Sequence, residues 1–360
     1  MQTQNNKLTF NGQNIYVGFD VHLKSWTVTI LTEKLTHKTF NQPPQPKVLF
    51  EYLSSNFPGA TYHSAYEAGF CGYWIHNSLK SMGIDSIVVN PADIPTTNKE
   101  RTQKEDSRDS RKIARALKNG DLKPIHVPNS QTLEDRTLVR TRGRLAKDLS
   151  RNKNRVKSFL YFHGIEIPEP FQKLNGRWSK PYIEWLKSLE FEQPSGRMAL
   201  DALILSAENS RDLILTVTKQ IKTISTHPEY REHIDLLKTI PGIGLITAMI
   251  IVLELETIHR FESLDTLCSY IGFIPSTHSS GEKESTGDIT HRGHPMLRSA
   301  IIESAWIAAR IDPALNKSYH AYCHRMDSNK AIIRIAKKLV SRIRFVLKNK
   351  KPYECSIDKQ

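Results

Sequence analysis

The stretch Ile15-Tyr16-Val17-Gly18-Phe19-Asp20-Val21-His22 decides the fold that we expect for the start of this chain. Its β-branched and aromatic residues predict a buried first strand. Asp20 is a lone carboxylate in this apolar setting, where an unpaired charge is costly. Asp20 is therefore a candidate metal ligand, although an Asp that caps a turn at the end of a strand would explain it as well.

Around this strand, the hydrophobic pattern predicts an α/β domain over residues 1–130. The expected strands are 15–22, 26–30, 38–41, 61–66 and 86–90, and the expected helices are 47–55, 73–82 and 104–118. This order of elements resembles the ribonuclease H-like (RuvC-like) fold. Enzymes of that fold carry carboxylates on the first strand, at the end of the fourth strand and on the last helix. The residues at these places here are Asp20, Glu67, Asp106 and Asp109.

Four converging carboxylates would repel one another unless a divalent cation lay between them. Hard oxygen ligands suit Mg²⁺, with Mn²⁺ as the alternative. Two such ions about 4 Å apart can hold the attacking and leaving oxygens of a phosphoryl transfer. Asp106 and Asp109 are three residues apart, so on a helix they share a face. Lys and Arg residues surround them, so a salt-bridged exposed helix is the structural alternative. A sugar kinase is the weaker interpretation, because Asp20 is not followed by the Gly and Thr that cradle phosphate.

The composition of the 360-residue chain favours a polyanionic partner. Its formal net charge is +14 and its pI is about 9.5, as is common for proteins that bind nucleic acid. The four cysteines are scattered and show neither metal spacing nor a disulfide framework, which predicts a reducing cytoplasm. No apolar run is long enough to span a bilayer and the first residues lack a signal-peptide core, so we expect no membrane partner.

The middle of the chain, residues 131–230, predicts a helical connector. A long basic helix is expected over 132–164 and a second over 197–224, with an irregular or small helical segment over 166–195 between them. Apolar positions on the first helix fit a heptad seam, which predicts a coiled coil. A single amphipathic helix packed on its own domain is the alternative. Together the two helices could form an antiparallel hairpin with oligomer contacts. The basic residues expected to contact phosphates here are Arg140, Arg144 and Arg151.

The last part, residues 231–350, predicts an all-α domain that contains a helix-hairpin-helix. Pro241-Gly242-Ile243-Gly244 lies between two helical segments. Gly242 and Gly244 would let backbone N–H groups approach a phosphate, and a tight turn without a ligand is the alternative. A polar loop follows with Ser279-Ser280-Gly281, which by itself reads as a turn. The basic groups that could hold a phosphate close to this loop are His291, Arg292 and Arg298.

These motifs together resemble the DEDD transposases of the insertion-sequence one-ten family and the related Piv-type DNA invertases. The resemblance covers nearly the full length in the right order. Two departures are Ser110, where the family often has Ala, and Glu282, which replaces the usual second Gly of the serine loop. The matching motifs are Gly18-Phe19-Asp20-Val21-His22, Tyr66-Glu67-Ala68-Gly69, Asp106-Ser107-Arg108-Asp109-Ser110, Pro241-Gly242-Ile243-Gly244, Gly272-Phe273-Ile274-Pro275 with Ser279-Ser280-Gly281, and Ile289-Thr290-His291-Arg292-Gly293.

The resemblance implies a transposase of an insertion sequence that cuts and rejoins DNA. In this family Ser280 would be the nucleophile, with Ser279 the weaker candidate, and the four carboxylates Asp20, Glu67, Asp106 and Asp109 would bind Mg²⁺. Ser280 would form a covalent link to DNA, and strand exchange would pass through a Holliday-type junction. Family members act as homo-oligomers (dimers or tetramers) with composite sites, and a bridge RNA guides them to DNA. The expected location is the bacterial cytoplasm, in association with the nucleoid.

Other functions stay open at this point. One is a Piv-type DNA invertase of the same build. A second is a metal-dependent Holliday-junction nuclease that uses water and forms no covalent intermediate. A third is a non-catalytic nucleic-acid-binding protein whose acidic residues only form salt bridges.

Overall fold

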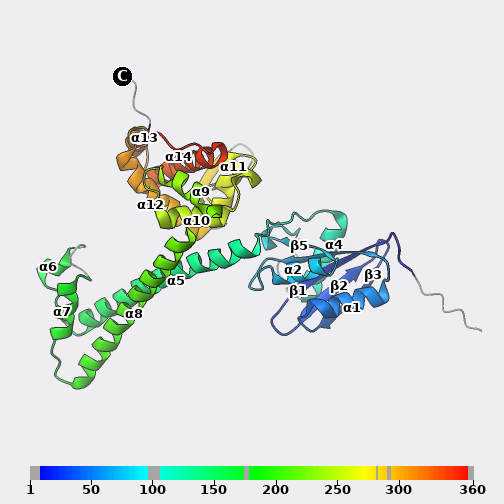
Figure 1. Cartoon of the computed structure of the whole chain (residues 1–360), viewed down its shortest axis with the longest axis horizontal. Coiled ribbons are helices and arrows are strands. Elements are labelled where there is room, and N and C mark those ends of the chain that lie inside the picture. Colours follow the sequence, from blue (N-terminus) through cyan, green and yellow to red (C-terminus); the bar gives the residue numbers. More distant parts are fainter. Residues whose placement is uncertain (1–8, 96–105, 174–177, 281–282, 290–292, 356–360) are drawn as a thin grey trace, which may run out of the picture. The chain divides into compact units, whose positions relative to one another are not determined.

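The computed structural model describes residues 9–95, 106–173, 178–280, 283–289 and 293–355 (Figure 1). Contacts divide the chain into two compact units, residues 1–127 and residues 128–360, and each is described by itself. In the part of the chain that is described, the helices are all too short or too polar to cross a membrane.

The first unit is a mixed five-stranded sheet with helices on both faces. The strand order is β3-β2-β1-β4-β5, in which β1, β2 and β3 pair antiparallel, whereas β1, β4 and β5 pair parallel. This α/β sheet confirms the predicted fold class and is consistent with the ribonuclease H-like expectation. The elements are β1 (Asn14–Val21), β2 (Trp26–Leu31), β3 (Thr36–Gln42), α1 (Pro46–Asn56), β4 (Thr61–Glu67), α2 (Trp74–Ser81), β5 (Asp85–Val89), the short 3-10 helix η1 (Pro91–Asp93) and α4 (Asp106–Asn119).

The two faces of β1 have different partners. Successive side chains of a strand alternate between the faces of its sheet. Val17 and Phe19 belong to the apolar core that includes Leu49 of α1 and Leu79 of α2. Gly18, which lies between them, therefore faces the opposite side of the sheet, which α4 covers.

α4 lies in close contact with the sheet at Gly18. A Cβ atom at this position would lie 2.2 Å from the backbone N of Ala114 and 2.4 Å from the carbonyl oxygen of Ser110. The hydroxyl groups of Ser110 and Thr29 share a hydrogen bond of 2.9 Å beside this contact. The backbone of the helix therefore rests directly on the backbone of the strand.

In the second unit, two long antiparallel helices come first. On α5, Arg142 Nε donates to Thr218 Oγ1 of α8 at 2.8 Å, and Asn152 Nδ2 donates to Ser210 Oγ at 2.9 Å. The predicted helical hairpin is therefore present, while the coiled coil stays a prediction. The segment predicted as irregular or as a small helical region forms two short helices. The bounds are α5 (Ser130–Phe162), α6 (Glu169–Gln172), α7 (Lys180–Ser188) and α8 (Pro194–Ile224).

The rest of the second unit packs around one large apolar core. We expected this part to be all α, and that expectation was wrong, because an antiparallel hairpin of β6 and β7 follows α11. The hairpin residues are mostly polar and lack the apolar alternation that signals a strand. The bounds are α9 (Pro228–Lys238), α10 (Leu245–Leu255), η2 (Ile258–Arg260), α11 (Leu264–Ile271), β6 (Pro275–Ser280), β7 (Lys283–Ile289), α12 (Pro295–Ile311), α13 (Pro313–Cys323) and α14 (Ser328–Asn349).

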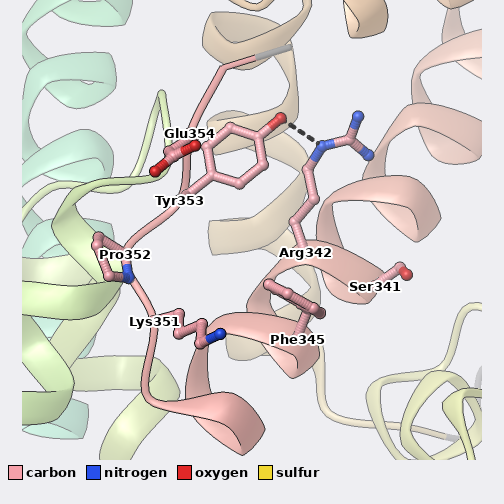
Figure 2. A pocket seen from close by; sticks show the side chains of 7 residues that line it. All are labelled: Ser341, Arg342, Phe345, Lys351, Pro352, Tyr353 and Glu354. Atoms are coloured by element: carbon pink, nitrogen blue, oxygen red, sulfur yellow. Dashed lines mark hydrogen bonds between the residues drawn. The ribbon is translucent and has the colours of Figure 1, made fainter.

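The segment after α14 is tied to the helical core through Tyr353 (Figure 2). Arg342 Nε donates to the Tyr353 hydroxyl at 2.8 Å, and that hydroxyl donates to the buried carboxylate of Asp312. The backbone N of Tyr353 also donates to Thr239 Oγ1 at 2.7 Å. A hollow of about 640 Å³ lies beside this segment, with Phe345 in its lining. The polar groups beside this hollow, Arg342 and Tyr353, hydrogen-bond to each other and hold the C-terminal segment against the helices.

Gly18→Ala should destabilise the first unit. The added methyl group cannot be accommodated by a side-chain shift, because its neighbours are backbone atoms of α4. Overpacking of this kind costs about 1–3 kcal/mol in the free energy of unfolding. Urea unfolding followed by circular dichroism would measure the change. Gly69→Ala is the matched control, since its nearest atom is 4.0 Å away, and an equal loss in both variants would contradict the role given to Gly18.

Candidate active site

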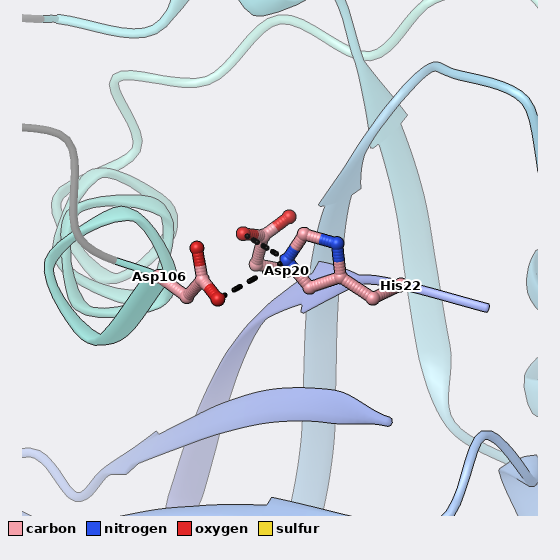
Figure 3. A group of neighbouring side chains, drawn as sticks. All are labelled: Asp20, His22 and Asp106. Carbon is pink, nitrogen blue, oxygen red and sulfur yellow. Dashed lines mark ion pairs between the residues drawn. The ribbon is translucent and has the colours of Figure 1, made fainter. Parts of the chain in front are cut away.

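Two acidic residues from distant parts of the first unit meet at the carboxyl end of β1 (Figure 3). Asp20 is the penultimate residue of β1, and Asp106 begins α4. His22 Nε2 lies between them, 3.2 Å from Asp20 Oδ2 and 3.3 Å from Asp106 Oδ2. The side chain of Asp106 is 58% exposed and that of Asp20 is 24% exposed. Among the described residues, the cluster is therefore open to solvent.

Glu67 ends β4, the strand beside β1. The two strands are parallel, with Phe19 opposite Tyr66, so Asp20 and Glu67 are the next residues of their strands. Ala65 packs in a small core with Ile113 of α4. Because residues two apart share a face, Glu67 follows Ala65 on the α4 side of the sheet. The backbone thus brings Glu67 to the same edge and face as Asp20.

Asp109 lies one helical turn after Asp106 and is held by a lysine. Its Oδ1 atom is 3.2 Å from Lys112 Nζ, and its side chain is 24% exposed. Its negative charge reaches Asp20: burial raises the pKa of Asp20, His22 opposes this rise, and the charges of Asp106 and Asp109 add to it. The charges of Asp20, Asp106 and Asp109 therefore affect one another. The ion pair of Asp109 with Lys112 is the kind of contact expected if these residues only formed salt bridges on an exposed helix.

His22 was not among the predicted site residues. The signal was present, because His22 is two residues after Asp20, so period-two alternation favours the same side of the sheet for both. His22 follows the end of β1, where its backbone N donates to the carbonyl oxygen of Ser25 at 3.2 Å in a tight turn. The turn directs the imidazole back over the end of the strand, which the strand pattern alone could not predict.

The acidic cluster fits a divalent cation. One ligand atom each from Asp20, His22 and Asp106 lies within 4.8 Å of the other two. Opposite ligands of an octahedral Mg²⁺ ion are about 4.2 Å apart, since each bond is about 2.1 Å. Small side-chain rotations would therefore bring these groups into one coordination sphere. The carboxylate oxygens suit Mg²⁺ or Mn²⁺, and an imidazole nitrogen is the softer ligand of the set.

The predicted nucleophile belongs to the second unit. Ser280 is the last residue of β6 and pairs with Lys283, while Ser279 pairs with Glu284. The backbone therefore carries both serines at the end of β6, where β6 pairs with β7, whereas an exposed polar loop was predicted here. Gly281 and Glu282 lie outside the described residues, as do the predicted phosphate ligands His291 and Arg292.

The basic residues predicted to contact nucleic acid differ in how the fold uses them. Arg140 makes two hydrogen bonds of 2.8 Å to the buried carboxylate of Glu254, and Arg298 Nη1 donates to the Gly272 carbonyl oxygen at 3.2 Å. These two guanidinium groups have structural partners that the sequence did not reveal. Arg144 and Arg151 are exposed on α5, although Arg151 also pairs with a neighbouring aspartate at 2.8 Å.

The two glycines of the predicted helix-hairpin-helix have different surroundings. Gly242 has a φ of 87°, and a Cβ atom there would lie 2.3 Å from the carbonyl oxygen of Ser304 on α12. Its lack of a side chain therefore serves packing. Gly244 precedes α10 as its N-cap and has open space around it. Of the two, Gly244 is the better placed to let a phosphate approach a helix N-terminus.

Comparison with known protein families gives two matches, which together include parts of both units. A model of DEDD transposases of the IS110 type, described as Transposase, matches residues 17–164. A second model, described as Transposase IS116/IS110/IS902 family, matches residues 234–320. The first match includes the four acidic residues, and the second includes the serine hairpin.

Individual relatives agree with these matches. The protein y4qE of Sinorhizobium fredii, provisionally named a transposase, is 30% identical over 252 residues, which are 70% of this chain and 60% of that protein. The transposase for insertion sequence element IS1533 of Leptospira borgpetersenii is 26% identical over 311 residues, 82% of this chain and 85% of that protein. The pilin gene-inverting protein of Moraxella bovis is 30% identical over 152 residues, 40% of this chain and 46% of that protein. The chain belongs to the IS110 family of DEDD transposases.

Proposed function

We propose that this protein is the transposase of an insertion sequence and that it cuts and rejoins DNA by phosphoryl transfer. The observation that carries the proposal is the convergence of Asp20 and Asp106 on His22 at the carboxyl end of β1. Glu67 ends the neighbouring strand on the same face, and Asp109 follows one turn along α4. Carboxylates gathered at an open edge of a sheet suit a cation-dependent reaction on a phosphodiester.

In this proposal Asp20, Glu67, Asp106 and Asp109 hold Mg²⁺, or Mn²⁺ in its place. When bound, the cation supplies positive charge next to the phosphate and to the oxygen that leaves it. By holding the cation, the carboxylates would place its positive charge beside the scissile phosphodiester. A carboxylate oxygen that is not bound to the cation would accept the proton that the nucleophile loses. Asp20 and Asp106 are open to solvent, and Nε2 of His22 lies 3.2 and 3.3 Å from one oxygen of each.

The nucleophile is Ser280 of the second unit. Its hydroxyl oxygen attacks the scissile phosphorus, the bond from phosphorus to the 3′ oxygen breaks, and the strand leaves as a free 3′ hydroxyl after protonation. The phosphate stays attached to the serine, so the energy of the phosphodiester is conserved. Attack by the 3′ hydroxyl of another strand then restores a phosphodiester and releases the serine. Repeated on paired strands, these steps pass through a Holliday-type junction, with composite sites formed by two copies of the chain.

We further propose that a bridge RNA selects the DNA. In such a system, base pairing reads the sequence while the protein contacts backbone and shape. The net charge of +14 supports a partner with many phosphates, and Arg144 and Arg151 are exposed on α5 to meet them. A structured non-coding segment within the element that carries the gene, and its co-purification with the protein, would test this proposal.

A DNA invertase is the second candidate, and one observation favours it. The 152-residue match to the pilin gene-inverting protein of Moraxella bovis is as close in identity as the match to y4qE, at 30%. The same serine and carboxylate chemistry would serve both outcomes. A recombination assay with ends of the element in direct or inverted orientation separates excision from inversion.

Asp20→Asn should lower the rate of DNA cleavage by about 100-fold or more, because it removes a charged ligand from the centre of the acidic cluster. DNA affinity should change little, since most binding energy comes from phosphate contacts elsewhere. Single-turnover cleavage and fluorescence anisotropy measure the two effects. The control is Asp121→Asn, an exposed aspartate just after α4. Cleavage by Asp20→Asn at the rate of Asp121→Asn would contradict the role given to Asp20. No cleavage by the unaltered protein in the presence of Mg²⁺ would support a non-catalytic nucleic-acid-binding protein.

Ser280→Ala should abolish the covalent protein–DNA adduct and recombination, because the nucleophilic oxygen is lost. Ser279→Ala is the matched control one residue away and should retain adduct formation. Denaturing gels with labelled DNA detect the adduct. Cleavage without an adduct in both variants would point to a hydrolytic nuclease, and loss in Ser279→Ala alone would move the nucleophile to that residue.

A further inference from the structure

The carboxylate of Glu254 on α10 is the centre of a buried polar cluster in the second unit. Its side chain is 1% exposed. Arg140 donates Nε to Oε1 and Nη2 to Oε2, both at 2.8 Å, and Arg136 Nε lies 3.4 Å from Oε2. His294 Nε2 lies 3.0 Å from the same oxygen. Burial alone would raise the pKa of Glu254, but hydrogen bonds from His294 and Arg140 and the charge of Arg140 hold it at about 2. Glu254 is therefore ionised.

His294 has a second role that determines where its proton lies. It is the N-cap of α12, and its Nδ1 atom accepts a hydrogen bond from the backbone N of Leu297 at 3.3 Å. An accepting Nδ1 carries no proton, so in a neutral ring the proton is on Nε2. Nε2 therefore donates to Glu254. The ring joins the first turn of α12 to the carboxylate on α10, and through it to the arginines of α5.

The same place is the root of the hairpin that carries Ser280. Gly272 precedes β6, Gly293 follows β7, and a Cβ atom on Gly293 would lie 2.5 Å from Gly272 Cα. The backbone N of His294 donates to the carbonyl oxygen of Ile271 at 3.2 Å. The two ends of the hairpin therefore meet at one point, and His294 holds that point against Glu254.

The contacts of this cluster restrict the position and the direction of the hairpin. The close approach of the two glycines sets the separation of the two strands at their root. The hydrogen bond from His294 to Glu254 sets their direction relative to α10 and α5. Arg136 donates twice to the Leu253 carbonyl oxygen, at 3.0 and 2.6 Å, so the end of α10 is itself fixed to α5.

We propose that Glu254 is a positioning residue for the serine hairpin, acting through His294 on one side and through Arg136 and Arg140 on the other. The role rests on the proposed function, in which Ser280 is the nucleophile. It also assigns Arg140 to orienting the hairpin, where sequence analysis expected a phosphate contact. A nucleophile displaced by about 1 Å can lose about 100-fold in rate, so a rigid root has a direct catalytic consequence.

The test uses two substitutions of His294 in the full-length protein. His294→Asn keeps a side chain that caps helices well but is too short to reach Glu254, whereas His294→Ala removes both the cap and the link. We expect His294→Asn to lower the rate of adduct formation at saturating DNA by between about 10- and 100-fold. DNA affinity should stay within about twofold of the original, because no phosphate contact is removed. An unchanged rate in His294→Asn would overturn the positioning role.

Hydrogen exchange gives a readout that does not depend on activity. In His294→Asn, amides of β6 and β7 should exchange faster, while amides of α9 and α14 keep their protection. Equally fast exchange throughout the second unit would show a general loss of stability and would overturn the specific role. This measurement also separates the two proposals. Adduct formation by Ser280→Ala would contradict the proposed function, whereas slow hairpin exchange in His294→Asn would contradict the positioning role alone.

Arg140→Gln distinguishes the two roles considered for that arginine. If Arg140 orients the hairpin, the variant should lower the rate of adduct formation, and combining it with His294→Asn should add less than the sum of the two effects, because both act on Glu254. A lower DNA affinity with an unchanged rate at saturation would instead identify Arg140 as a phosphate contact and overturn its place in the cluster.

Discussion

The contact between Gly18 of β1 and the backbone of α4 is the constraint on which the acidic site depends. With no side chain at Gly18, the helix approaches until Ser110 and Ala114 touch the strand itself. At that separation the first turn of α4 lies over the end of β1, and Asp106 comes within reach of Asp20. A residue without chemical function thus sets the distance between two residues that we propose to be catalytic.

Bringing carboxylates together has an electrostatic cost that the site itself offsets. Lys112 lies against Asp109, and the imidazole of His22 lies between Asp20 and Asp106. Lys112 Nζ lies 3.2 Å from Asp109 Oδ1, and His22 Nε2 lies 3.2 Å from Asp20 Oδ2 and 3.3 Å from Asp106 Oδ2. In the proposed function, a cation would take the place of these partners on the carboxylates of the first unit.

The second unit uses charge in a different way. Glu254 is buried and ionised, and it stays so because two arginines and a histidine satisfy its oxygens. A buried ion pair contributes little net stability. An arrangement that separates the partners is strongly disfavoured, however, because it leaves one charge buried and unpaired. Placed at the root of β6 and β7, such a cluster selects one orientation for the hairpin. Of the arginines on α5, Arg136 and Arg140 pair with Glu254, whereas Arg144 and Arg151 are exposed to solvent.

The sequence by itself determined the local features and their order. Period-two patterns marked the strands around Asp20, helical periodicity marked α5 and α8, and glycines marked turns, because these signals arise between residues close together in the chain. The family motifs then supplied the chemistry to expect at Asp20, Glu67, Asp106, Asp109 and Ser280.

Only the tertiary structure decided which side chains meet. His22 lies in the acidic cluster because a turn follows β1. Arg140 hydrogen-bonds to a glutamate 114 positions away. A polar segment forms a β-hairpin because the backbones of β6 and β7 pair with each other. Such contacts depend on packing between elements distant in sequence, and the pattern of neighbouring residues carries no record of them.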